Sequence, residues 1–375
     1  MQVSRARKLV LAGALAVGGL IMATGASSGW FAAFGGRAAG ERLERIRRSP
    51  RFVDGKFRNP VPTNMLAPGT LWEMLHHQFF GKEQRVPPGP LPVVMHAGAD
   101  YASPPLSGLR ATWIGHASTL IEIDSARVLT DPIWSERCSP STLVGPRRFH
   151  PPPIALAALP PIDAVVISHD HYDHLDMATI QALAARGTRF VVPLGVGAHL
   201  ERWGVAAGQI SELDWEESIQ VAGLTITATP ARHYSGRNPL RGDETLWASW
   251  AIAGPAHRIW FSGDTGYFDG FKTVGLKHGP FDLTLIKIGA CDKTWPDIHL
   301  SPEEAVQAHQ DLGGGGLLLP VHWGTFNLAF HAWNDPAERV VAASRKSGVT
   351  LAVPRPGEWV EPSRPPPVEA WWRAP

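Results

Sequence analysis

Short apolar runs separated by turn residues recur between Arg110 and Val321, with the length and bounds of buried strands. The predicted strands lie at 112–115, 119–123, 127–130, 162–168, 189–193, 218–221, 224–229, 246–252, 258–262, 283–288 and 317–321. Helices are predicted between them at 177–185, 197–203 and 301–312, where Ser301 and Glu304 have the spacing of a capping box. Strands interleaved with helices predict an α/β fold of packed sheets flanked by helices.

The stretch from Gly35 to Arg110 is polar, rich in proline and glycine, and only weakly periodic. One short helix is predicted at Leu71–Phe80, because four of its residues follow at helical spacing: Trp72, Leu75, His76 and Phe79. We interpret the basic run Arg42–Arg48 as a solvated surface, with a contact to anionic lipid as the alternative.

The N-terminus has the pattern of an export segment. Arg5, Arg7 and Lys8 precede the uncharged apolar run Leu9–Ala23, an order typical of a signal peptide. The run can continue to Phe34 and so reach the ~20 residues of a spanning helix. A cleaved signal peptide and a retained membrane anchor therefore stay open, and a buried helix of the fold is the less favoured alternative. In the first two cases we expect an exported protein, either periplasmic or anchored in the membrane and facing outside the cytoplasm.

These changes in character divide the chain into four parts. The parts are a signal peptide or membrane anchor at 1–36, an N-terminal extension at 37–108, the sandwich domain at 109–360 and a Pro-rich, irregular tail at 361–375.

Composition narrows the function classes. With 375 residues, 44% hydrophobic and 18% charged, the chain is neither disordered nor a multi-span membrane protein. A formal net charge of +1 provides no field to recruit nucleic acid, so no nucleic-acid partner is expected. Cys138 and Cys291 are too few for a disulfide framework or a cysteine-rich zinc module, and we expect two unpaired thiols.

The segment Ser168–Asp176, S-H-D-H-Y-D-H-L-D, carries the strongest chemical signal. Residues two apart in an extended loop point the same way, so His169 and His171 can hold one metal while Asp173 and His174 hold a second. Nitrogen and carboxylate ligands without thiolate favour a catalytic Zn²⁺ site. A surface histidine cluster is the alternative, but the order H-x-H-x-D-H directly after an apolar strand argues against it.

Three later residues complete the ligand set, because each follows a predicted strand: His233, Asp264 and His322. Gly263 and Gly266 around Asp264 allow a tight backbone turn there. One metal would be held by His169, His171, His233 and Asp264, and the other by Asp173, His174, Asp264 and His322. Asp264 would bridge the two, which predicts two Zn²⁺ per chain.

These ligands and six further motifs resemble a known family. The motifs are A-T-W-I-G-H-A at 111–117, T-D-P-I at 130–133, L-P-P-I-D-A-V at 159–165, L-W-A-S-W at 246–250, G-D-T-G-Y at 263–267 and H-W-G-T-F at 322–326. The chain resembles the metallo-β-lactamase superfamily, whose fold is a four-layer αββα sandwich. Within it, the match from about Leu71 to Phe330 is similar to N-acylphosphatidylethanolamine-hydrolysing phospholipase D. The resemblance is thin at 232–244 and does not cover the export-type N-terminus.

The resemblance implies a phospholipase D-like phosphodiester hydrolase that releases an N-acylethanolamine and a phosphatidic acid from an N-acylated phospholipid. It also implies that His299 lies near the reacting phosphate. Two zinc ions would lower the pKa of a bound water and supply hydroxide at neutral pH. The expected catalytic residues are Asp173 and Asp264, which would steer that hydroxide, and His299, which would donate a proton or hydrogen bond.

The expected partners are a phospholipid or other small-molecule substrate and a membrane surface, while a homodimer is left open. Asp131 and Asp176, with His116 as a weaker candidate, are expected to accept hydrogen bonds from the metal-binding histidines. The alternative for these three residues is ordinary turn and capping polarity. Two other functions compete: a lactonase or other small-molecule hydrolase with the same metal site, and a catalytically silent anchored zinc protein.

Overall fold

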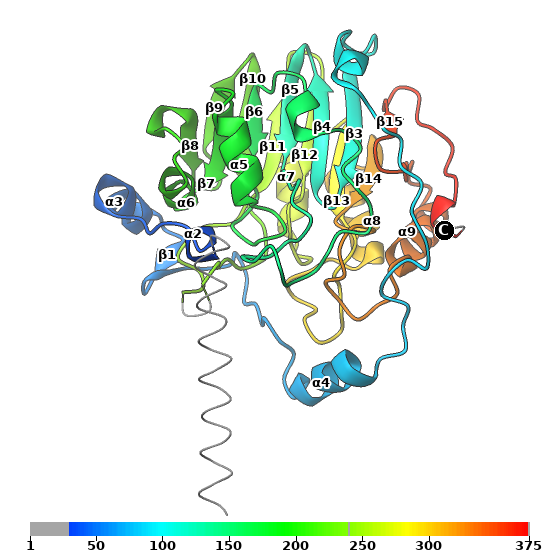
Figure 1. Ribbon diagram of the computed structural model, residues 1–375, viewed down its shortest axis with the longest axis horizontal. Coiled ribbons are helices and arrows are strands. Elements are labelled where there is room, and N and C mark those ends of the chain that lie inside the picture. The colour runs from blue at the N-terminus through cyan, green and yellow to red at the C-terminus, as the bar shows by residue number, and fades with distance from the viewer. Residues whose placement is uncertain (1–29, 239–240, 374–375) are drawn as a thin grey trace, which may run out of the picture.

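The computed structural model describes residues 30–238 and 241–373, and two stacked sheets form its centre (Figure 1). The first sheet has seven strands in the order β15 (Trp359–Val360), β3 (Leu109–Gly115), β4 (Ser118–Ile123), β5 (Ala126–Thr130), β6 (Ala164–Val166), β7 (Arg189–Pro193) and β8 (Ile210–Leu213). The second sheet has six strands in the order β14 (Leu317–Val321), β13 (Leu283–Lys287), β12 (Arg258–Phe261), β11 (Ser249–Ala253), β10 (Leu224–Thr229) and β9 (Ser218–Val221).

Both faces of the first sheet are buried, which explains its nearly continuous apolar runs. Val166 of β6 packs in a core that also contains Trp250 of the second sheet. Its neighbour Val165 points the other way and packs with Ile180 and Leu183 of α5 (Met177–Ala184). One strand thus contributes to two cores.

Helices cover the outer faces of both sheets. The first sheet is covered by α5 and α6 (Gly197–Arg202), while α7 (Gly270–His278), α8 (Pro302–Asp311) and α9 (Asp335–Ser347) belong to the second (Figure 1). The capping box predicted for α8 is present, with Ser301 Oγ accepting from Glu304 N at 3.3 Å. The order helix, sheet, sheet, helix confirms the predicted αββα sandwich.

The N-terminal extension lies against this sandwich. It contains α2 (Trp30–Ala33), α3 (Gly40–Arg48), β1 (Phe52–Val53), β2 (Lys56–Phe57) and α4 (Leu71–Phe80). Arg42 of α3 pairs with Glu212 at 2.5 Å and Glu201 at 2.7 Å, so this basic run is partly neutralised by the domain itself. Most of the export segment, residues 1–29, lies outside the described residues. In the described part of the chain, no helix combines the length and apolar character needed to cross a membrane.

The structure corrects two expectations outside the centre. The tail is not simply irregular, because it ends in a 3₁₀ turn at Trp371–Arg373 whose two tryptophans are buried. The strand predicted at 246–252 begins later, at Ser249, since Leu246 pairs with Leu194 in a loop instead. Cys138 and Cys291 are buried free thiols, as expected.

The tail tryptophans support the strand ends. Trp371 lies 5.3 Å from Trp323, ring centre to ring centre, and Trp323 stacks on Trp113 at 5.5 Å. The indole N–H of Trp113 donates to the carbonyl of His116 at 2.9 Å. The aromatic stack therefore connects the tail to the turn that follows β3.

We predict that Trp372→Ala lowers the free energy of unfolding by about 3–5 kcal/mol, because it leaves a cavity where a large side chain was removed. Trp372 is 1% exposed and donates to Glu338 Oε1 at 2.8 Å. Trp72→Ala is the matched control, since Trp72 is 80% exposed and its loss should change stability by less than about 0.5 kcal/mol. Urea denaturation of both variants checks this, and equal losses would contradict it.

Candidate metal centre

The predicted ligands meet at one edge of the sandwich because each follows the carboxyl end of a strand. β3, β5 and β6 run in one direction within the first sheet, as do β10, β12 and β14 within the second. Strands in one direction deliver the residues that follow them to the same edge. All seven predicted side chains lie there: His169, His171, Asp173, His174, His233, Asp264 and His322.

The first group, His169, His171 and His233, places three ring nitrogens together. His169 Nε2 lies 2.8 Å from His171 Nδ1, which lies 3.4 Å from His233 Nε2. Asp170, between the first two, points away and accepts from Gly236 N at 2.7 Å. The alternation expected of an extended loop is therefore present.

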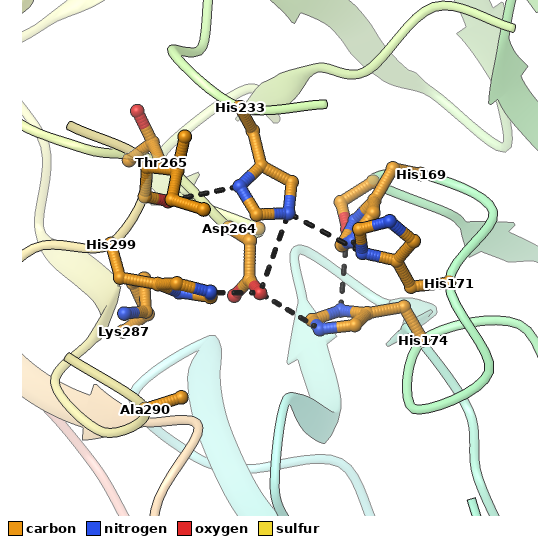
Figure 2. Close-up of polar contacts among 12 residues, drawn as sticks. His169, His171, His174, His233, Asp264, Thr265, Lys287, Ala290 and His299 are labelled. Carbon is orange, nitrogen blue, oxygen red and sulfur yellow. Dashed lines mark hydrogen bonds and ion pairs between the residues drawn. The ribbon is translucent and has the colours of Figure 1, made fainter. Parts of the chain in front are cut away.

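The second group, Asp173, His174 and His322, lies beside the first. Asp173 Oδ2 is 3.3 Å from both His174 Nε2 and His322 Nε2, and these two nitrogens are 3.1 Å apart. Asp264 stands between the groups, with its Oδ2 3.4 Å from His174 Nε2 and 3.8 Å from His233 Nε2 (Figure 2). Asp264 thus occupies the bridging position that the sequence predicts.

The turn that carries Asp264 needs its glycines. Gly263 has a φ of +52°, and a side chain there would collide with Ser168. Gly266 approaches the carbonyl of Asp297 so closely that no Cβ fits. The expected tight turn is therefore built, and it presses the Asp264 loop against the His169 loop.

His116 is a member of the centre that the sequence did not reveal as one. Its Nε2 lies 2.9 Å from Asp173 Oδ2, and its ring centre is 3.9 Å from that of His322. It reaches this position from a left-handed backbone conformation, φ 53°, at the end of β3. The motif G-H-A marks the residue, but only the turn geometry brings it to Asp173.

The protonation states suit metal binding. Burial lowers the pKa of His116 and of His233 to about 3, so both rings are neutral at pH 7. Burial alone would raise the pKa of Asp264, but His322, His174 and His299 hold it well below its ordinary value. Neutral imidazole and ionised carboxylate are the forms that bind metal.

The donor set fits a pair of cations. Asp264 Oδ1 and His322 Nδ1 are buried and, among the described residues, find no hydrogen-bond partner. His174 and His233 use Nδ1 to donate outward, to Asp131 at 2.7 Å and to the carbonyl of Ile298 at 2.9 Å, which leaves their Nε2 lone pairs facing inward. Inward lone pairs around a buried carboxylate repel one another unless cations lie among them.

Comparison with known proteins agrees with this geometry. The model of the beta-lactamase superfamily domain matches residues 126–323, more than half of the chain. The chain belongs to the metallo-β-lactamase superfamily. As such it is a metal-dependent hydrolase, and its buried His/Asp groups are the candidate ligands.

Similar members come from distant organisms. An uncharacterized protein of Mycobacterium tuberculosis is 51% identical over 351 residues, 91% of this chain and 92% of the relative. The N-acyl-phosphatidylethanolamine-hydrolyzing phospholipase D 1 of Caenorhabditis elegans is 38% identical over 264 residues, 67% of this chain and 73% of the relative. The mitochondrial enzyme of that name from Saccharomyces cerevisiae is 32% identical, covering 61% and 50%.

Solved structures share the fold. A metallo hydrolase from Ignicoccus hospitalis aligns with a TM-score of 0.52 at 23% identity, covering 67% of this chain and 97% of that one. An isothiocyanate hydrolase from Delia radicum gut bacteria aligns with a TM-score of 0.54 at 19% identity, covering 67% and 98%. At these identities the likeness concerns the sandwich alone.

Within this metallo-hydrolase fold, the supporting aspartates have different roles. Asp131 is completely buried; its Oδ2 accepts from His174 Nδ1, and its Oδ1 accepts from Ser168 N at 2.7 Å. Asp176 was expected to do the same, but it accepts from the backbone N–H groups of Trp134 at 3.3 Å and Ser135 at 3.0 Å. Asp176 therefore orders a loop, and the expectation that it orients a metal ligand is wrong.

We predict that Asp131→Asn weakens metal binding about 10- to 100-fold, because an amide cannot replace the carboxylate that fixes the His174 tautomer. Asp176→Asn is the matched control: a neighbouring aspartate on the same loop that touches none of the ligands. Its metal affinity should equal that of the unmodified protein. Competition titration with a chromogenic zinc chelator measures both, and equal affinities for the two variants would contradict the assignment.

Proposed function

We propose that the protein is a dizinc phosphodiesterase that cleaves N-acylphosphatidylethanolamine-type phospholipids in the manner of a phospholipase D. The observation that carries the substrate class is the 38% identity, over two thirds of the chain, to a phospholipase D that hydrolyses this lipid. The complete ligand set at the sheet edge supports the dizinc part of the proposal, because a bridging carboxylate between two groups of imidazoles suits a two-metal site.

The residues would divide the two metals between them as the geometry groups them. The first group with Asp264 would hold one zinc, and the second group with Asp264 the other. When bound, the zinc pair supplies Lewis-acid polarisation of a phosphoryl oxygen and a water of lowered pKa. Asp173 contacts His116 as well as His174, so its position is fixed from two sides.

His299 is placed to act on the substrate. Its Nδ1 lies 3.7 Å from Asp264 Oδ2 and, within the described part of the chain, has no hydrogen-bond partner (Figure 2). Its ring also borders a cavity of about 480 Å³ that Phe330 and Ser301 line. A group at this boundary can donate a hydrogen bond to the phosphate or a proton to the leaving alcohol.

We predict that Asp264→Asn abolishes hydrolysis of N-acylphosphatidylethanolamine in vesicles and lowers the bound zinc below two per chain. The amide removes the bridging charge on which both groups depend. Metal analysis and turnover are measured on the same preparation, together with a panel of soluble diesters and lactones. Two zinc ions with turnover of lactones alone would discard the lipid substrate, and a metal-loaded protein without any turnover would support a silent zinc protein.

We predict that His299→Gln keeps two zinc ions per chain but lowers kcat for the lipid by about 100-fold, the usual contribution of a general acid. A change in the pH profile of kcat accompanies this loss if His299 transfers a proton. Loss of zinc together with activity would instead make His299 a ligand, as its proximity to His233 and Asp264 also allows.

A further inference from the structure

The helix α4 exposes a strongly apolar face. Leu71 is 64% exposed, Trp72 80% and Phe79 74%. Eight of the seventeen large hydrophobic side chains that the described residues expose lie between positions 61 and 80: Val61, Met65, Leu66, Leu71, Trp72, Leu75, Phe79 and Phe80. Isolated exposed leucines are ordinary, whereas a contiguous apolar patch marks an interaction surface.

The polarity of α4 is the reverse of a normal surface helix. Leu71, Leu75 and Phe79 follow at four-residue spacing and face outward. The side toward the protein is polar: Glu73 pairs with Lys293 at 2.5 Å, and His77 stacks on Phe330 at 5.7 Å. Polar contacts thus hold the helix to the domain while its apolar residues remain in water, standing off from the sandwich (Figure 1).

We propose that this apolar face of α4 docks on a phospholipid bilayer and presents lipid to the metal centre. Tryptophan and phenylalanine beside leucine on one face of a short helix are typical of interfacial membrane helices. Lys82, exposed just beyond the helix, supplies a positive charge suited to anionic headgroups. The chain before Trp30 also carries the uncharged run Leu9–Ala23, which would hold the domain near a bilayer.

The docking face is connected to the centre. His77 of α4 lines the same cavity of about 480 Å³ as His299, with Phe330 between them in the chain of contacts. A lipid lifted at α4 would therefore reach His299 and Asp264 without crossing the sandwich. Delivery of substrate rests on the proposed function, whereas docking itself does not.

Docking can be tested on full-length protein that carries Asp264→Asn, so that no lipid is consumed. Phe79→Cys is labelled with a polarity-sensitive fluorophore, and Leu276→Cys, at an 88% exposed leucine of α7, is the matched control. The native Cys138 and Cys291 are buried. Vesicles of phosphatidylethanolamine and phosphatidylglycerol are added, with and without brominated acyl chains.

We expect the emission at position 79 to shift to the blue on vesicle addition and to be quenched by the brominated chains, while position 276 stays unchanged. Identical behaviour at the two positions would overturn the proposal. A blue shift that needs no vesicles and grows with protein concentration would overturn it as well, since a second copy of the chain would then cover the face. Insertion at position 79 without any hydrolysis by the unmodified enzyme would leave docking standing and reject the lipase function.

The functional consequence is tested with Trp72→Asp combined with Phe79→Asp. The ratio of vesicle turnover to turnover of a soluble phosphodiester should fall about tenfold, because charges replace the groups that enter the bilayer. Leu276→Asp should leave the ratio unchanged. An equal loss on both substrates would show that α4 serves the fold of the site instead of docking.

Discussion

The Oδ2 atom of Asp264 lies 3.1–3.8 Å from nitrogens of four histidines, His174, His233, His299 and His322, while the side chain is only 3% exposed. A carboxylate this deeply buried is costly unless positive charge compensates it. Neutral imidazoles cannot provide that charge, since burial keeps the pKa of His233 near 3. Charge balance at Asp264 therefore requires cations, and the positions of the surrounding loops follow from the need to hold them.

The supporting structure serves this requirement from outside. Asp131 fixes His174 and Ser168, which ties the end of β5 to the loop after β6. The stack of Trp371, Trp323 and Trp113 carries the C-terminal tail to the carbonyl of His116. Segments far apart in the sequence are thereby locked to one edge of the sandwich, which is why the tail is buried despite its proline content.

The sequence predicts most of the strands and all seven ligands because both leave local signals. Apolar runs mark strands buried on two faces, and the ligands follow the ends of those runs. β15 escapes prediction because its two residues are ordered only by pairing with Thr112 and Ala111 of β3. His116 escapes for the same kind of reason: a positive φ and the packing of His322 decide where its ring points. Helical spacing locates α4, but only the tertiary contacts of Glu73 and His77 show that its apolar side faces outward.

The contacts of α4 also bear on how a buried centre can serve a lipid. Phe330, on which His77 stacks, packs 5.3 Å from Trp295 and lies under the guanidinium of Arg85 at 4.9 Å. Trp295 in turn donates to the carbonyl of Ala290, in the segment that leads to His299. The outward face of α4 and the catalytic loop are thus joined through a short aromatic chain of contacts. Such a connection fixes the orientation of the site relative to whatever surface α4 touches, so that a headgroup entering from that side meets His299 first and the bridging carboxylate second.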